Sequence, residues 1–333
     1  ILSGLVGSEM CIRDRFVNRF NRGPESVSDL HTSRHSMPTY SQKNSLGYRS
    51  DEEIAQYLAL IGDSEGEREL LAAGFSGQTG GLFTRKPYSH TGMIVGFVPQ
   101  GDHPGEREVL GASRIAAQPE LIGKPIKITL DRFHVASYPG LGKHTILCEF
   151  SGCNQAETKK EDLTFARRFD AADGAAAGVS GAPIFMGLNV SPDGISFKGR
   201  TVNVRSSGDS KILETLDSPA FRGGLSLLHT AQPALIPFTN LTTAAVKQAL
   251  ADKKNAQVHT FDLGLDFGEG RSSVRLRAGS YVVLQSDEGA RWKWDDFAWN
   301  DDGMALCYRH DRTTPIPFNY MVFSIDTMSA AKR

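Results

Sequence analysis

Alternation of apolar and polar residues runs through most of the chain and predicts short β-strands. In Pro125–Arg132, for example, Ile126, Ile128 and Leu130 share one face of an extended chain, as a half-buried strand requires. Further predicted strands are the hydrophobic run Met93–Val98 and the segments His144–Phe150, Leu163–Phe169, Pro183–Val190, Ile195–Val204, Val258–Phe267, Met304–Arg309 and Asn319–Ile325. Turn-forming residues separate them at short intervals, so the sequence predicts a mostly β protein with an antiparallel β-sandwich.

The stretch Ser273–Asp302 combines strands with all three tryptophans. Ser273–Arg277 alternates in polarity, Gly279 permits a turn, and Tyr281–Leu284 is apolar on both faces. This pattern predicts a hairpin whose second strand is central and covered on both sides. The candidate ligand-binding residues follow it: Trp292, Trp294, Asp295, Asp296 and Trp299. Such an aromatic–acidic patch suits a cationic, sugar or peptide ligand, whereas the alternative is that the tryptophans fold back over the sandwich end as core.

Helical periodicity occurs before the strands and again between them. Ser50 and Glu53 form a capping box ahead of an apolar helical face, and Ser64 begins a second short helix. Asp209–Leu216 and a helix capped by Asn240 are expected later. The predicted organisation is therefore 16–49 disordered or extended, 50–91 a helical hairpin, 92–205 a first β-sandwich unit, 206–255 a helical crossover, and 256–333 a second β unit packed on the first.

The beginning of the chain carries a resemblance that sets it apart from the rest. Val6–Arg15, VGSEMCIRDR, resembles the in-frame translation of sequencing-adapter DNA. The resemblance implies that residues 1–15 are an adapter-derived artefact and that the sequence comes from uncurated, metagenomic assembly. It also implies that the true start lies further along, with Met37 as one candidate.

Charge and cysteine content narrow the class of protein. A net charge of −1 lacks the basic excess of a nucleic-acid binder, and no apolar run approaches the length of a transmembrane segment. Cys148, Cys153 and Cys307 remain once Cys11 is set aside, and no second ligand pair accompanies them at zinc-binding spacing. We interpret them as buried free thiols, which favours a reducing compartment and a cytoplasmic location.

One motif points to nucleophilic catalysis. Gly178–Pro183, GVSGAP, resembles the G-x-S-G-x-P nucleophile turn of trypsin-like serine proteases. The resemblance implies Ser180 as nucleophile and Asp131 as the residue that orients a histidine base. That base would come from His90, His134 or His144. Val179 stands where this family carries an acidic residue, and no Ala-Ala-His signature precedes the motif. The alternative is a glycine-rich turn that enters the strand Pro183–Val190.

A second group of residues suits calcium. The expected sandwich is similar in size and loop placement to C2-type modules, with a jelly-roll-like arrangement as the other architecture. C2-type modules bind Ca²⁺ through loop carboxylates, so the resemblance implies a site at Asp131, Asp170 and Asp173. The alternative for Asp170–Gly174 is a turn in an exposed loop, stabilised by an aspartate side chain.

These patterns favour a non-catalytic binding or assembly module that presents ligand- or partner-binding loops on a β-sandwich. They do not establish nucleophile, base and orienter together, which a hydrolase requires. A serine hydrolase acting through Ser180 and Ca²⁺-assisted binding to a membrane or protein are the alternatives. A protein partner or a homo-oligomer is expected, and no cofactor is expected apart from Ca²⁺ in the last alternative.

Overall fold

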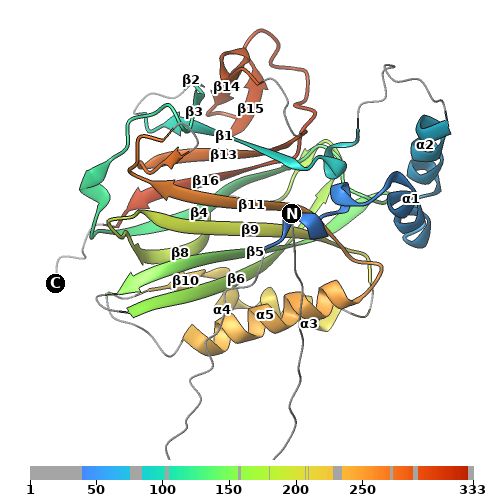
Figure 1. Cartoon of the computed structure of the whole chain (residues 1–333), viewed down its shortest axis with the longest axis horizontal. Coiled ribbons are helices and arrows are strands. Elements are labelled where there is room, and N and C mark those ends of the chain that lie inside the picture. Colours follow the sequence, from blue (N-terminus) through green and yellow to red (C-terminus); the bar gives the residue numbers. More distant parts are fainter. Residues whose placement is uncertain are drawn as a thin grey trace, which may run out of the picture. The chain divides into compact units, whose positions relative to one another are not determined.

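The fold is built on two large β-sheets packed face to face (Figure 1). The computed structural model describes residues 40–75, 85–101, 105–156, 159–179, 181–206, 208, 210–227, 235–270, 273–287 and 292–328. All of them belong to one compact unit, Ser36–Arg333. The antiparallel sandwich that the sequence predicts is confirmed. Residues 1–15 and most of the segment 16–49 lie outside the described residues.

Sheet A contains the strands that run through the middle of the molecule. Its order is β10-β8-β4-β16-β13-β1-β3, with the short β7 paired to β4, and only β10 runs parallel to its neighbour. The strands are β1 (Gly92–Pro99), β3 (Leu110–Gly111), β4 (Pro125–Val135), β7 (Ala175–Ala176), β8 (Ala182–Asn189), β10 (Leu225–Ser226), β13 (Gly279–Ser286) and β16 (Tyr320–Thr327).

Sheet C forms the other layer, in the order β12-β11-β9-β5-β6. Its strands are β5 (Lys143–Ala156), β6 (Lys159–Ala172), β9 (Ile195–Val204), β11 (Ala256–Asp266) and β12 (Val274–Arg275). β5 and β6 form one long hairpin, paired from Lys143 and Ala172 to Ala156 and Lys159.

Phenylalanines fill the space between the two sheets. Phe150, Gly199 and Phe261 are direct neighbours across β5, β9 and β11, so they share the inner face of sheet C. Phe197 lies on that face too, and its ring meets Phe323 of sheet A edge-on with 5.0 Å between centroids. A Cβ at position 199 would lie 2.3 Å from the Phe261 ring, which explains the glycine between two large aromatics.

A small third sheet covers the opposite face of sheet A. Sheet B consists of β2 (Glu106–Glu108), β14 (Phe297–Asn300) and β15 (Ala305–Tyr308) in the order β15-β14-β2. Phe297, Trp299 and Leu306 pack there against apolar side chains of β13 and β16. β13 is therefore buried on both faces, as its sequence predicts.

The two β units expected from the sequence do not form separate sheets. Each of the two large sheets contains strands from 92–205 and from 256–333, so the two expected β units form one sandwich. The expected hairpin around Ala278-Gly279 is also wrong. β12 pairs with β11 in sheet C, whereas β13 pairs with β1 and β16 in sheet A. Gly279 brings the backbone close to the Phe97 ring, where a Cβ would clash.

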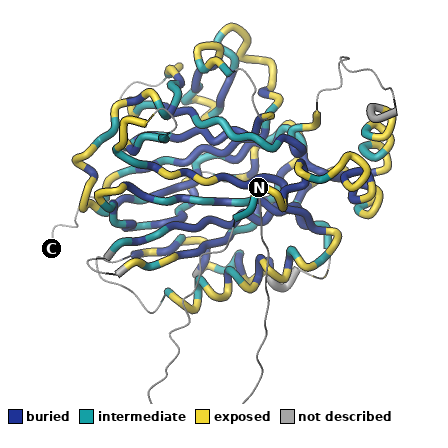
Figure 2. Tube along the Cα trace, in the orientation of Figure 1, coloured by how far each residue is buried: buried dark blue, intermediate teal, exposed yellow. Residues whose placement is uncertain are grey.

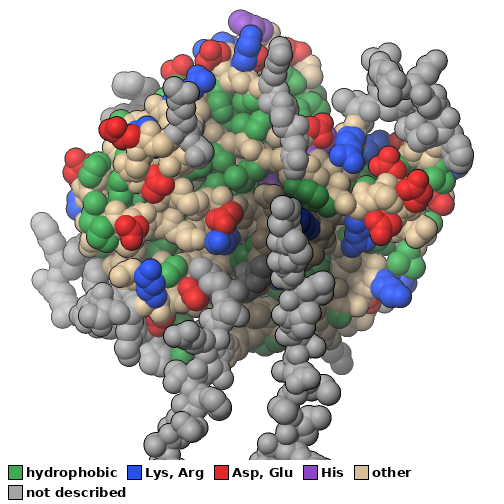
Figure 3. Space-filling model, in the orientation of Figure 1, with side chains coloured by type: hydrophobic (Ala, Val, Ile, Leu, Met, Phe, Trp, Pro, Cys, Tyr) green, Lys and Arg blue, Asp and Glu red, His purple; other side chains and the backbone are tan. Residues whose placement is uncertain are grey.

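The predicted N-terminal helical hairpin is confirmed as α1 (Asp51–Leu60) and α2 (Ser64–Phe75), with the Ser50–Glu53 capping box at the start of α1. Asp63, rather than Ser64, caps α2, because its Oδ1 accepts from the backbone N–H of Gly66 at 2.9 Å. α2 is largely exposed (Figure 2). Figure 3 shows acidic side chains gathered over this hairpin, which carries acidic residues in the first turn of each helix.

Three helices lie along the β6 side of the sandwich (Figure 1). They are α3 (Ser210–Leu216), α4 (Pro219–Arg222) and α5 (Ile236–Ala251). Phe221 of α4 stacks on Phe165 of β6 and meets Phe238 of α5. Asn240 does not cap α5 as expected, because the helix begins at Ile236 and accommodates Pro237 in its first turn.

Residues 40–49 form a strap over the outer face of sheet C, where the sequence predicted a disordered or extended segment. Two 3₁₀ turns, Gln42–Asn44 and Leu46–Tyr48, bury Leu46 completely. The Gln257 side chain donates to the carbonyl of Ser41 at 2.9 Å, and the Arg200 guanidinium lies over the Tyr40 ring. The remaining 3₁₀ turns are Pro87–Ser89, Pro119–Leu121 and Trp294–Asp296.

Candidate functional site

The three tryptophans take part in the packing between sheets A and B. Trp299 is 3% exposed, and its indole N–H donates to Asp301 Oδ1 at 3.0 Å. Trp292 is half-buried and stacks on Phe297 with 4.6 Å between centroids. Trp294 is half-buried over β1, where a Cβ on Gly96 would come within 2.7 Å of its ring.

The two aspartates of the predicted aromatic–acidic patch lie on the surface. Asp295 and Asp296 are exposed in the 3₁₀ turn that precedes β14. The structure thus brings Trp292 and Trp294 together, with 5.3 Å between ring centroids, but buries the Trp299 side chain between sheets A and B. The ligand-binding role of this patch stays a prediction.

The residues proposed for serine chemistry are not assembled in the described structure. Ser180 lies outside the described residues, and the glycine-rich segment around it leads into β8. His134 Nε2 is 3.3 Å from the carbonyl oxygen of Ile316. Asp131 instead accepts from the hydroxyls of Thr129 and Ser324. Asp131 therefore does not orient His134.

Of the other two histidines considered as bases, neither is open to a substrate. His144 is fully buried, its Nδ1 accepts from Arg205 at 3.0 Å, and its Nε2–H donates to Asp173 at 2.8 Å. Buried His90 has its Nε2 3.1 Å from the carbonyl oxygen of Arg85.

Burial lowers the pKa of His134 to about 4, partly opposed by its hydrogen bond to Ile316. Because the unfolded chain binds this proton more tightly, His134 should cost the folded protein stability as the pH falls from about 6.5 to about 4. Phenylalanine can keep the stacking on Tyr320 but does not titrate. We expect His134→Phe to flatten the loss of melting temperature across this pH range. An unchanged pH profile would contradict the neutral, buried imidazole.

The proposed calcium ligands are engaged separately. Asp170 accepts from Thr145 at 2.9 Å and pairs with Arg168 at 3.0 Å. Asp173 accepts from the Tyr138 backbone and from His144, while Asp131 lies on β4 in the other sheet. Among the described residues, no group of three or more His, Cys, Asp or Glu side chains is placed to hold a metal ion.

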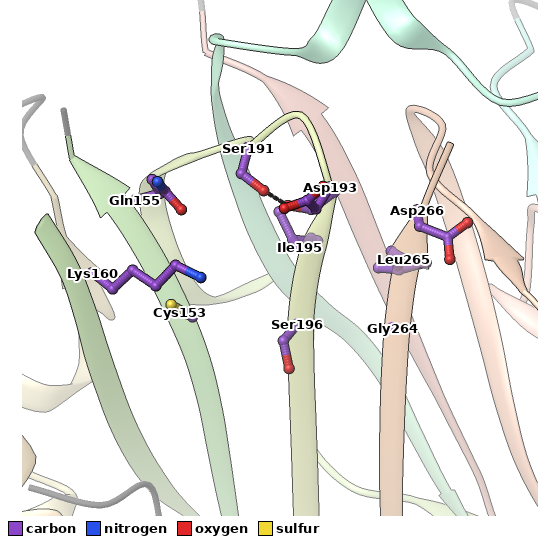
Figure 4. Close-up of a pocket in the computed structure, with 11 residues that line it drawn as sticks. Cys153, Gln155, Lys160, Ser191, Asp193, Ile195, Ser196, Gly264, Leu265 and Asp266 are labelled. Carbon is purple, nitrogen blue, oxygen red and sulfur yellow. Dashed lines mark hydrogen bonds between the residues drawn. The ribbon is translucent and has the colours of Figure 1, made fainter. Parts of the chain in front are cut away.

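A cavity of about 290 Å³ lies at one end of sheet C and opens to solvent (Figure 4). Its floor is the outer face of the sheet, where Cys153 of β5, Ser196 of β9 and Gly264 of β11 present small side chains or none. A Cβ at position 264 would meet nothing within 4 Å, so the space above this strand is empty. The cavity therefore exists because small residues coincide on three neighbouring strands.

The start of one strand and the turn before another form the walls of the cavity. The start of β6 contributes Lys160, which pairs with Gln155 of β5 in the hairpin. The turn between β8 and β9, which the sequence predicted, is closed by Ser191, whose hydroxyl donates to the carbonyl of Gly194 at 2.7 Å. Gly194 has φ +91°, and a Cβ there would lie 2.0 Å from the Leu265 carbonyl, so the turn packs tightly against β11.

The cavity carries one thiol and charges of both signs. Burial, with the nearby Asp162 carboxylate, raises the pKa of the Cys153 thiol, which therefore stays protonated at neutral pH. Within the part of the chain that the structure describes, neither Lys160 nor Asp193 takes part in an ion pair, and both side chains are exposed. The arrangement can offer hydrogen bonds and two charged groups of opposite sign to a small polar molecule.

Sequence reasoning missed this site. Lys160 lies in β6 and Asp193 lies in the turn between β8 and β9, and no sequence motif connects these two segments. These residues meet because β5 and β9 pair in sheet C, and that pairing has no signature in the sequence. The small residues at 153, 196 and 264 were the available signal, and they become visible only once the register is known.

Comparisons with protein-family models, with curated proteins and with solved structures found no match to the chain. In the described ranges, no helix has both the length and the apolar character needed to span a bilayer. The function must therefore be argued from the geometry of the chain itself.

Proposed function

We propose that this protein is a non-catalytic binding module whose small polar ligand occupies the cavity at the end of sheet C. The observation that carries the proposal is the pair of side chains at its walls: Lys160 and Asp193 border a cavity of about 290 Å³, and each lacks an ion-pair partner among the described residues. The small residues of the floor leave room for a ligand, and the charged groups at the walls can orient a polar one.

Binding rather than catalysis fits the groups that border the cavity. Cys153 is the nucleophilic side chain on its floor, and its raised pKa leaves little of the reactive thiolate. Among the described residues that line the cavity, none is a histidine that could act as a base. The free thiols Cys148, Cys153 and Cys307 favour a reducing compartment, so we propose the cytoplasm as the place of action.

The dimensions favour a small ligand. At roughly 30 Å³ for each water molecule, the cavity corresponds to about ten waters, close to the lower end of ordinary ligand pockets. Because it opens to solvent, the ligand keeps part of its hydration, and we expect an affinity in the micromolar to millimolar range.

Cys153 provides the test, because it lines the cavity and is half-buried, whereas Cys148 and Cys307 are buried. In a Cys11→Ser background, we expect pools of small polar metabolites to slow alkylation of Cys153 by N-ethylmaleimide. A ligand at ten times its Kd should slow it about tenfold. The modified residue is identified by peptide mass spectrometry.

Two glycine variants make the test specific. Gly264→Leu should fill the cavity without backbone strain and abolish protection, because position 264 faces open space. Gly223→Leu is the matched control, since a Cβ there also meets nothing within 4 Å and Gly223 does not line the cavity. The proposal fails if no pool protects Cys153, or if protection is the same in the Gly264→Leu protein.

A further inference from the structure

The charges that border the cavity are of opposite sign and belong to separate segments, the β5–β6 hairpin and the turn that joins β8 to β9. Figure 4 shows the Lys160 side chain extending across the cavity, while Asp193 lies on the turn above its floor. Lys160 is held by β6, and Asp193 by the Ser191–Gly194 turn, which packs against β11. The two charges are therefore fixed to different walls of one cavity.

The other carboxylate at the cavity is already engaged. Asp266 Oδ1 accepts from the backbone N–H of Gly268 at 2.9 Å, and in Figure 4 its carboxylate points away from Lys160. Asp162 lies opposite Cys153 in the β5–β6 hairpin but does not line the cavity. Asp193 is thus the acceptor for a positive group, and Lys160 is the partner for a negative one.

Resting on the proposed function, we propose that the ligand is a small zwitterion, with the free α-amino acids as its simplest class. Its carboxylate lies against Lys160 and its ammonium group against Asp193. An anion bound alone would be repelled by the negative charge of Asp193. A cation bound alone would be repelled by the positive charge of Lys160. A zwitterion can pair with both charges at once. A molecule of about ten non-hydrogen atoms matches the volume of the cavity.

The test compares free amino acids with forms in which one charge is removed. A panel of α-amino acids is titrated by isothermal calorimetry, and each binder is compared with its N-acetyl derivative and its methyl ester. We expect binding of at least one free amino acid, weakened about two- to fivefold by either modification, as for solvent-accessible ion pairs. Equal affinities for free and blocked forms would overturn the zwitterion.

Matched variants assign the two charges to the two walls. Lys160→Gln should remove the preference for the free acid over the ester, and Asp193→Asn should remove the preference for the free amine over the N-acetyl form. Lys86→Gln is the control, since Lys86 pairs with Glu69 beside α2 and should leave both preferences intact. Retention of both preferences in Lys160→Gln and Asp193→Asn would overturn the assignment.

The outcome separates this inference from the proposed function. If no amino acid binds, yet a metabolite pool still protects Cys153 in a manner that Gly264→Leu abolishes, the zwitterion is wrong and the binding function stands. If neither titration nor protection detects a ligand, both fail together.

Discussion

Phe197→Ala is expected to lower the free energy of unfolding by about 3–5 kcal/mol, the range for deleting a buried aromatic ring. Phe197 is 1% exposed on the inner face of β9. Its ring lies within 6.2 Å of four other phenylalanine rings, centroid to centroid, which belong to both sheets: Phe150, Phe185, Phe261 and Phe323. Alanine would leave a cavity between the sheets that rigid strands on both sides cannot close.

Urea denaturation followed by circular dichroism measures this loss. Phe197→Leu is the matched control, because leucine keeps most of the buried apolar volume, and we expect it to lose less than half as much stability. A loss below about 1 kcal/mol for Phe197→Ala would mean that the two sheets do not share this core.

Arg200→Met is expected to cost about 3–5 kcal/mol at neutral pH, because it leaves a buried carboxylate without its partner. Glu149 is 0% exposed on the outer face of sheet C, and Arg200 Nε donates to its Oε2 at 2.5 Å. Tyr40 of the strap covers this pair. Methionine replaces the aliphatic part of arginine but cannot neutralise Glu149.

The pH dependence distinguishes a lost charge from lost packing. Burial raises the pKa of Glu149, and Arg200 partly opposes this. The folded protein therefore binds the Glu149 proton more tightly than the unfolded chain does. Its contribution to stability falls as the pH rises from about 4.5 through the raised pKa. Without Arg200 that pKa is higher still, so the deficit of Arg200→Met should shrink between about pH 8 and about pH 5.

Glu149→Gln combined with Arg200→Met should recover much of the lost stability, because no buried charge remains. Thermal melting of both variants across this pH range is the measurement. A deficit that does not change with pH, or a double variant as unstable as the single one, would contradict a buried ion pair beneath the strap.

The strands could be predicted because sandwich strands carry their burial pattern locally. β4 and β9 alternate in polarity over much of their length, and β13 and the first half of β16 are apolar on both faces, so each strand was located close to its observed bounds. Sheet membership was not predictable. Val274 and Tyr281 are close in sequence, yet they belong to different sheets. Strand pairing depends on contacts between distant segments, which local patterns do not encode.

The candidate site was less accessible to sequence reasoning for the same reason. The three tryptophans stand out in the sequence because they are rare residues close together. How they pack depends on the contact between sheet B and the outer face of sheet A, which the sequence does not reveal. The cavity depends on what is missing, namely large side chains at Cys153, Ser196 and Gly264. Small residues on separate strands draw no notice until the register places them side by side.

A crystal structure of the chain with a ligand found by Cys153 protection tests the central claim most directly. The account predicts electron density for that ligand between the Lys160 amine and the Asp193 carboxylate, above Gly264. Density over Trp292 and Trp294 instead, or a cavity closed by a direct Lys160–Asp193 ion pair, would contradict it.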